Sequence, residues 1–184
     1  MSQLKIGVLV GSLRMDSFNR RLARAVENLA PEEFAFRHLQ INDLPLYSQD
    51  FDAAYPAVAS RLKKDVESVD ALLFVTPEYN RSIPGVLKNA IDIASRPWGT
   101  NSFAGRPAGI IGTSIGSTGT ALAQQHLRNV LTYLDMPLLA QPEVFIQFKD
   151  ELIADDGSIS NDGTRKFLQG FVDSYVAWVR RFAR

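Results

Sequence analysis

The chain has 184 residues, of which 20 are basic and 20 acidic, so its formal net charge is zero. This balance, without a long run of either sign, argues against nucleic acid or an anionic membrane as a partner. Cysteine is absent, which excludes disulfides, thiolate catalysis and cysteine metal sites. No apolar stretch approaches the ~20 residues of a membrane span, and the N-terminus enters a strand without a signal peptide. We therefore expect one cytoplasmic domain over residues 1–184.

Apolar runs of strand length alternate with helical periodicity along the chain. The predicted strands are Leu4–Val10, Phe34–Leu39, Ala71–Val75, Ala108–Thr113 and Val144–Gln147. Apolar residues at steps of three or four follow each strand, as at Leu22, Val26 and Leu29. The continuous apolar runs suit strands that are covered on both faces. The alternation predicts an α/β fold with a doubly wound parallel sheet.

Two long connections lack this periodicity, from Ile41 to Pro56 and from Lys149 to Gly163. In the second, Asp155-Asp156-Gly157 and Asn161-Asp162-Gly163 are typical of surface turns. A calcium loop would need more regular acidic spacing and a closing glutamate. Two histidines, His38 and His126, have no metal-like partner spacing, so we interpret them as structural.

The most informative segment follows the first predicted strand. The apolar run Ile6–Val10 stops at Gly11, and a helix begins near Ser17 after a short polar loop. A buried strand that feeds a polar loop and a helix N-terminus is how α/β proteins build an anion site. The donors here are Ser12, Arg14, Ser17 and Asn19. The first helical turn carries arginines and no acid, and a bound phosphate would supply the missing negative charge.

Two interpretations of this loop stay open. In one, Ser17 is only an N-cap, and Arg20 and Arg21 form a solvated helix face. In the other, the loop holds a phosphate. The Gly-Lys-Ser/Thr tripeptide of nucleoside triphosphate loops and the three glycines of the dinucleotide fingerprint are both missing. The second interpretation therefore predicts a monophosphate held by side chains and helix N–H groups.

Two further loops belong to the same predicted edge, because ligands lie beyond the carboxyl ends of parallel strands. The loop Thr76–Gly85 is dense in polar and ring-bearing residues and is stiffened by prolines. The loop Ser114–Thr120 combines glycines, which permit close backbone approach, with hydroxyl donors. Both loops are also consistent with ordinary connections between a strand and a helix. In the second of them, Ser117 or Thr118 would then be an N-cap. Three such loops at one edge favour a binding site.

These segments resemble the NADPH-dependent FMN reductase family of the flavodoxin-like superfamily, and most closely its quinone, chromate and azo-dye reductase branch. The resemblance is carried by Gly11-Ser12-Leu13-Arg14, Thr76-Pro77-Glu78-Tyr79-Asn80 and Pro84-Gly85 with Leu87-Lys88-Asn89-Ala90-Ile91-Asp92. It implies a five-stranded flavodoxin-like sheet in the order 2-1-3-4-5 with helices on both faces. Flavodoxins themselves are strongly acidic, as suits a carrier that docks on basic partners, and this chain is not.

The resemblance also implies a bound FMN and its contacts. The FMN phosphate would be held, with the Phe18 amide assisting, by Ser12, Arg14, Ser17 and Asn19. The isoalloxazine ring would be contacted, mostly through main chain, by Pro77, Glu78, Tyr79 and Asn80, with Ser117 adding a contact from the third loop. Family members are commonly dimers or tetramers, so a homodimer or homotetramer is expected, with Tyr79 and Arg81 near the partner chain.

The expected activity is reduction of quinones or other small oxidants (chromate, azo compounds, free flavin) by NAD(P)H. The bound FMN would carry the hydride in a ping-pong sequence. No side chain is predicted to be catalytic, and no metal site is predicted. Two alternatives remain: an FMN-binding electron carrier or redox sensor without NAD(P)H turnover, and a protein that binds another phosphorylated ligand. A phosphate-receiver domain would need an aspartate where Val75-Thr76-Pro77 stands.

Overall fold

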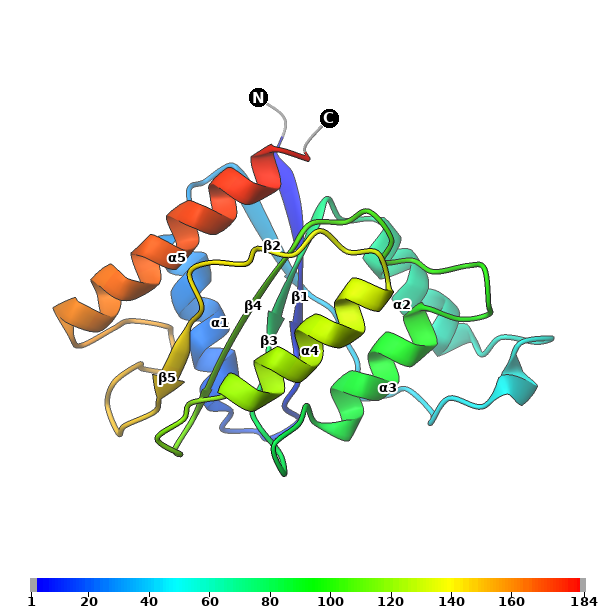
Figure 1. Ribbon diagram of the computed structural model, residues 1–184, viewed down its shortest axis with the longest axis horizontal. Helices are drawn as coiled ribbons and strands as arrows, with labels where there is room; N and C mark the ends of the chain where they lie inside the picture. Colours follow the sequence, from blue (N-terminus) through cyan, green and yellow to red (C-terminus); the bar gives the residue numbers. More distant parts are fainter. Residues whose placement is uncertain (1–2, 183–184) are drawn as a thin grey trace.

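The computed structural model describes residues 3–182, which form a five-stranded sheet flanked by helices (Figure 1). The strands are β1 (Leu4–Val10), β2 (Phe34–His38), β3 (Ala71–Val75), β4 (Ala108–Ser114) and β5 (Phe145–Gln147). The helices are α1 (Phe18–Leu29), α2 (Ala57–Glu67), α3 (Gly85–Ala94), α4 (Ala121–Tyr133) and α5 (Asp162–Arg180), with a 3₁₀ turn, η1 (Gln49–Phe51). The order is β2-β1-β3-β4-β5 with every pair parallel, which confirms the predicted flavodoxin-like sheet.

The sheet separates two hydrophobic cores. Successive side chains of a strand point to opposite faces, so Ile6 and Val8 of β1 join one core and Leu9 joins the other. The first core is closed by α1 and α5, and the second by α2, α3 and α4. Figure 1 shows these two groups of helices on opposite sides of the sheet. Every residue of the central strand β3 is buried, as its continuous apolar run predicts.

The strand boundaries agree with the sequence at β1 and β3 and differ by one residue elsewhere. β2 ends at His38 rather than Leu39, and β4 continues one residue beyond Thr113. β5 begins one residue later than predicted, where the Val144 carbonyl accepts a hydrogen bond from the Gln124 side chain at 2.7 Å. A side-chain partner thus replaces the sheet partner at this edge.

One of the two predicted surface turns is wrong. The turn at Asp155–Gly157 is confirmed, and Gly157 takes a positive φ of 84°. The segment Asn161–Gly163 instead starts α5. Asn161 is its N-cap, and the side-chain oxygen accepts a hydrogen bond of 2.8 Å from the Thr164 N–H. Asparagine serves in both turns and N-caps, so composition alone did not separate them.

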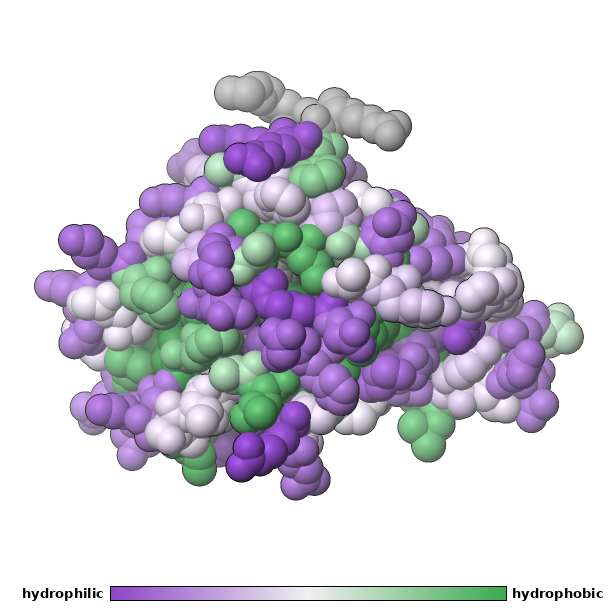
Figure 2. Space-filling view, in the orientation of Figure 1, coloured by the Kyte–Doolittle hydropathy of each residue, from purple (hydrophilic) through white to green (hydrophobic). Residues whose placement is uncertain are grey.

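The helices are amphipathic, and α4 illustrates this well. Ala123, Leu127 and Leu131 are buried against the sheet, whereas Gln125 and Asn129 are exposed. Figure 2 shows the outer face of α4 as a largely hydrophilic patch near the middle of the molecule. Among residues 3–182, no helix combines the length and the apolar character that a membrane crossing requires.

The loops that follow β1, β3 and β4 leave the same edge of the sheet (Figure 1). This edge is formed by the carboxyl ends of the strands, where open α/β sheets bind ligands. The topology therefore brings the three predicted loops together.

Candidate functional site

The loop between β1 and α1 is anchored at both ends. Gly11 donates its N–H to the Val75 carbonyl at 2.9 Å, which extends the sheet into the first residue of the loop. Ser17 is the N-cap of α1, and its hydroxyl oxygen accepts a hydrogen bond of 3.3 Å from the Arg20 N–H. The predicted helix start near Ser17 is confirmed, and the first turn holds no acid.

Between these anchors, the main-chain N–H groups face no protein acceptor. Within residues 3–182, none of the N–H groups from Ser12 to Asn19 donates a hydrogen bond. The Ser12 and Ser17 residues are nevertheless buried, with 8% and 4% of their surface exposed. The residues between them are exposed, and main-chain donors without protein partners at the positive end of a helix are the arrangement that binds phosphate. The loop therefore fits the phosphate of FMN.

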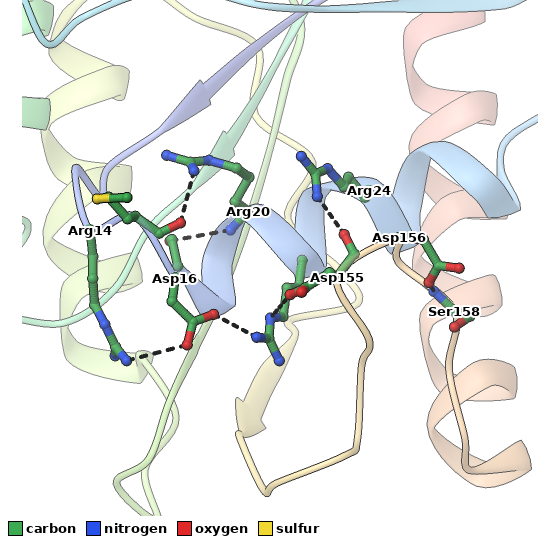
Figure 3. A network of polar contacts seen from close by, with 10 residues as sticks. Arg14, Asp16, Arg20, Arg24, Asp155, Asp156 and Ser158 are labelled. Atoms are coloured by element: carbon green, nitrogen blue, oxygen red, sulfur yellow. Dashed lines mark hydrogen bonds and ion pairs between the residues drawn. The ribbon is translucent and has the colours of Figure 1, made fainter.

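Arg14, the predicted phosphate ligand, lies on the outer side of this loop (Figure 3). Its guanidinium carbon is 4.8 Å from the centroid of the Phe18 ring, and the group lies 3.7 Å from the Asp16 carboxylate. Phe18 in turn stacks on Phe148, with ring centroids 3.9 Å apart. Cation–π contact thus holds the guanidinium beside the loop, while 57% of the side chain stays exposed to an incoming anion.

Asn19 has a role that sequence reasoning missed. Its buried side chain donates a 2.9 Å hydrogen bond to the Thr113 carbonyl and accepts one of 3.0 Å from the Thr113 N–H. These two bonds clamp the start of α1 to β4. The side chain therefore positions the loop, and the main-chain N–H of Asn19 is the group it offers to a phosphate. No local pattern signals a contact between residues 94 positions apart.

Ion pairs join the outer side of the loop to the segment before α5 (Figure 3). The Arg21 guanidinium lies 2.5 Å from the Asp16 carboxylate and 2.7 Å from the Asp155 carboxylate. Hydrogen bonds from the main chain and the hydroxyl of Ser158 lower the pKa of the neighbouring Asp156. Sequence reasoning missed this network as well, because its partners come from distant segments.

The loop between β3 and α3 is a tight hairpin. Tyr79 and Ser82 exchange two main-chain hydrogen bonds, of 2.9 and 3.0 Å. The two residues between them, Asn80 and Arg81, both have positive φ, of 51° and 63°. Positive φ at both central positions defines the primed turn that closes two-residue hairpins. The turn projects Tyr79 outward, with 54% of its surface exposed.

Two side-chain contacts tie this hairpin to α4. The Glu78 carboxylate accepts hydrogen bonds from the N–H groups of Leu122 at 3.1 Å and Ala123 at 3.0 Å. A carboxylate at this position satisfies unpaired donors and complements the helix dipole. The Ser82 hydroxyl lies 2.7 Å from Nδ1 of His126, a structural contact of the kind predicted for this histidine. Glu78 thus braces the loop, and its main chain is left for a ligand.

The loop between β4 and α4 folds back onto Ser114, the last residue of β4. The Ser114 hydroxyl donates to the carbonyl of Gly119, which has a positive φ of 60°. The N-cap of α4 is Thr120, so the alternative that placed it at Ser117 or Thr118 is wrong. Ser117 is exposed at the turn, so it is accessible to a ligand at this edge.

A parallel sheet in this order, with a donor-rich loop at the start of its first helix, defines a flavodoxin-like protein. Residues 4–151 match the NADPH-dependent FMN reductase family, and the chain belongs to that family. It is 56% identical over 177 residues to a 2-hydroxy-1,4-benzoquinone reductase of Burkholderia sp, a match that covers 96% of this chain and 97% of that protein.

One further relative and one solved structure also support the assignment to a family of reductases. The chain is 46% identical over 182 residues to a quinone reductase of Pseudomonas putida, with 98% of this chain and 97% of that protein covered. The structure of the flavoenzyme NAD(P)H:acceptor oxidoreductase FerB from Paracoccus denitrificans superposes with a TM-score of 0.93 at 47% identity, covering 97% and 98% of the two chains. The chain is accordingly an oxidoreductase with FMN as cofactor and NAD(P)H as co-substrate.

Proposed function

We propose that this protein is an NAD(P)H:quinone reductase that holds FMN across the three loops at the carboxyl edge of the sheet. The observation that carries the proposal is the row of main-chain N–H groups from Ser12 to Asn19 that meet no protein acceptor. They lie at the helix end where a phosphate binds best. The quinone substrates named for the Burkholderia and Pseudomonas relatives support the choice of oxidant.

In this proposal the chain binds the two ends of FMN in different ways. The phosphate end is held by Ser12, Arg14, Ser17 and the main-chain N–H groups of Phe18 and Asn19. The ring end is contacted by Pro77, Glu78, Tyr79, Asn80 and Ser117. When bound, FMN supplies the redox chemistry by taking a hydride from NAD(P)H and passing the two electrons to the oxidant.

The chain's own contribution is position. The primed turn and the Glu78 bonds to α4 fix the main-chain groups of the second loop before a ligand arrives. Donors that are already placed cost little ordering entropy on binding. No side chain in the three loops is assigned as a proton donor.

The proposal is tested on the protein as purified. We expect visible absorption from bound FMN, loss of that absorption with NADPH under anaerobic conditions, and its return with a benzoquinone. Multiple turnovers with excess NADPH and quinone distinguish an enzyme from an electron carrier or sensor. Bleaching without turnover supports the carrier, and a colourless protein that takes up no FMN contradicts the proposal.

We further infer that the protein works in the cytoplasm as a homodimer or homotetramer. A hollow of about 370 Å³ between α3 and α4 is lined in part by Ile91, Val130 and Tyr133. Tyr133 and the nearby Trp98 are 70% and 75% exposed. The other walls of the hollow are mostly charged or polar, and exposed aromatic side chains with a polar surround are typical of subunit contacts. Sedimentation equilibrium should find a dimer or tetramer, and Tyr133→Asp should shift it toward the monomer.

A further inference from the structure

A hollow of about 520 Å³ lies against the end of the first loop and the first two turns of α1. This volume falls in the range of small-molecule sites. Its walls carry three arginines and two aspartates, namely Arg20, Arg21, Arg24, Asp16 and Asp155. Ser17, the N-cap of α1, also lines it, so the hollow adjoins the phosphate loop.

The arginines differ in how their charge is balanced. Arg21 pairs with both aspartates, at 2.5 and 2.7 Å. Arg20 donates to the main-chain carbonyl of Met15 at 3.1 Å, and Arg24 donates to that of Asp155. Neither Arg20 nor Arg24 forms an ion pair with any carboxylate of residues 3–182. The three arginines and two aspartates of the walls therefore leave a net positive charge of one, and Arg20 and Arg24 are the two arginines of the hollow without an ion pair.

Their placement makes these two charges unfavourable without a ligand. Arg20 and Arg24 are four residues apart on α1, and Figure 3 shows both along the same side of the helix. Like charges at this spacing repel each other. Arg20 also stands in the first turn of α1, at the positive end of the helix dipole. A multivalent anion between them relieves both effects, whereas Asp16 and Asp155 are held by Arg21.

We propose that Arg20 and Arg24 bind the 2′-phosphate of NADPH, and that this hollow sets a preference for NADPH over NADH. The inference rests on the proposed function, because it assumes that a nicotinamide coenzyme reduces this protein. Arginine is the residue that accommodates a 2′-phosphate at other nucleotide sites, through paired N–H bonds to its oxygens. The 2′-phosphate is the one dianionic group that NADPH has and NADH lacks.

The direct test is calorimetric titration of the FMN-loaded protein with adenosine 2′,5′-bisphosphate and, separately, with adenosine 5′-monophosphate. We expect the bisphosphate to bind at least about 10-fold more tightly, as charged hydrogen bonds to one phosphate predict. Arg20→Ala and Arg24→Ala should each reduce this difference by about 10-fold. Lys166→Ala, which removes an exposed cation on α5, is the matched control and should leave the difference unchanged.

A second readout is the ratio of kcat/KM for NADPH to that for NADH, in which any loss of flavin or folded protein cancels. Both arginine variants should lower this ratio, and the control should not. Equal binding of the two adenosine ligands to the parent protein, or variants that keep the parent's discrimination, would overturn the inference. FMN content and quinone turnover of the same samples report separately on the proposed function, so the two failures are distinguishable.

Discussion

The first and second loops at the carboxyl edge of the sheet differ in how their main-chain groups find hydrogen-bond partners. In the first, from Ser12 to Ser17, main-chain donors are left without protein partners. In the second, from Thr76 to Pro84, the chain satisfies itself through the Tyr79–Ser82 hairpin and the Glu78 bonds to α4. Main-chain N–H groups without protein acceptors are available to bind an anion, whereas hydrogen bonds within a loop hold it rigid. The same sheet edge thus holds both kinds of loop.

The support beneath the first loop gives the largest expected effect. Asn19→Ala removes both hydrogen bonds that Asn19 makes to the Thr113 main chain, leaving a buried N–H and a buried carbonyl without these partners. We expect the free energy of unfolding in urea to fall by about 2–4 kcal/mol. Asn28→Ala is the control, because Asn28 is exposed and donates only to the Asp156 carbonyl. Asn28→Ala should lower the free energy of unfolding by less than about 1 kcal/mol. Equal losses in the two variants would show that the Asn19 hydrogen bonds to Thr113 do not stabilise the start of α1.

The receptor character of the first loop is tested by Arg14→Ala. If the guanidinium makes a charged hydrogen bond to phosphate, the variant should lose roughly 1.5–3 kcal/mol of FMN binding free energy. Fluorescence titration of the apoprotein measures this. Lys64→Ala removes an exposed cation on α2 and should keep the parent's affinity. An unchanged affinity for Arg14→Ala would mean that the side chain serves only Phe18 and Asp16.

The bracing of the second loop predicts a moderate effect on stability. Glu78→Ala leaves the N–H groups of Leu122 and Ala123 without their cap, which should cost about 1 kcal/mol in the free energy of unfolding. Glu78→Gln keeps an acceptor oxygen and should recover part of that loss. If neither variant changes the urea midpoint, the contact with α4 does not hold the loop.

The exposed tip of the second loop should affect stability least. Tyr79→Ala removes a side chain that is more than half exposed, so the free energy of unfolding should change by less than about 0.5 kcal/mol. We expect a larger change in turnover or in oxidant preference than in FMN affinity. A variant that loses its flavin yet keeps its rate per bound flavin would show that Tyr79 serves to bind FMN and not to set turnover or oxidant preference.

Local patterns predicted the sheet and the start of the site well. The bounds of β1 and β3 were predicted correctly, because the apolar runs Ile6–Val10 and Ala71–Val75 lie within these strands and end at Gly11 and at Thr76. Ser17 was located as the helix start for a similarly local reason, the preference of serine for N-caps.

What the sequence did not reveal depends on contacts between distant segments. The Asn19–Thr113 clamp and the Arg21–Asp155 pair join residues that no periodicity or spacing relates. The side-chain role of Glu78 became visible only with the N-terminus of α4 in place. In each case the sequence shows a polar side chain, but its partner is identified only once the fold brings the distant segment beside it.

The most direct measurement compares the affinities of the apoprotein for FMN and for riboflavin by calorimetry, because the two ligands differ only in the phosphate. If the unpaired N–H groups at the start of α1 receive that phosphate, FMN should bind about 100-fold more tightly or better. Equal affinities for the two flavins would contradict the account, since the first loop would then contribute nothing that depends on the anion.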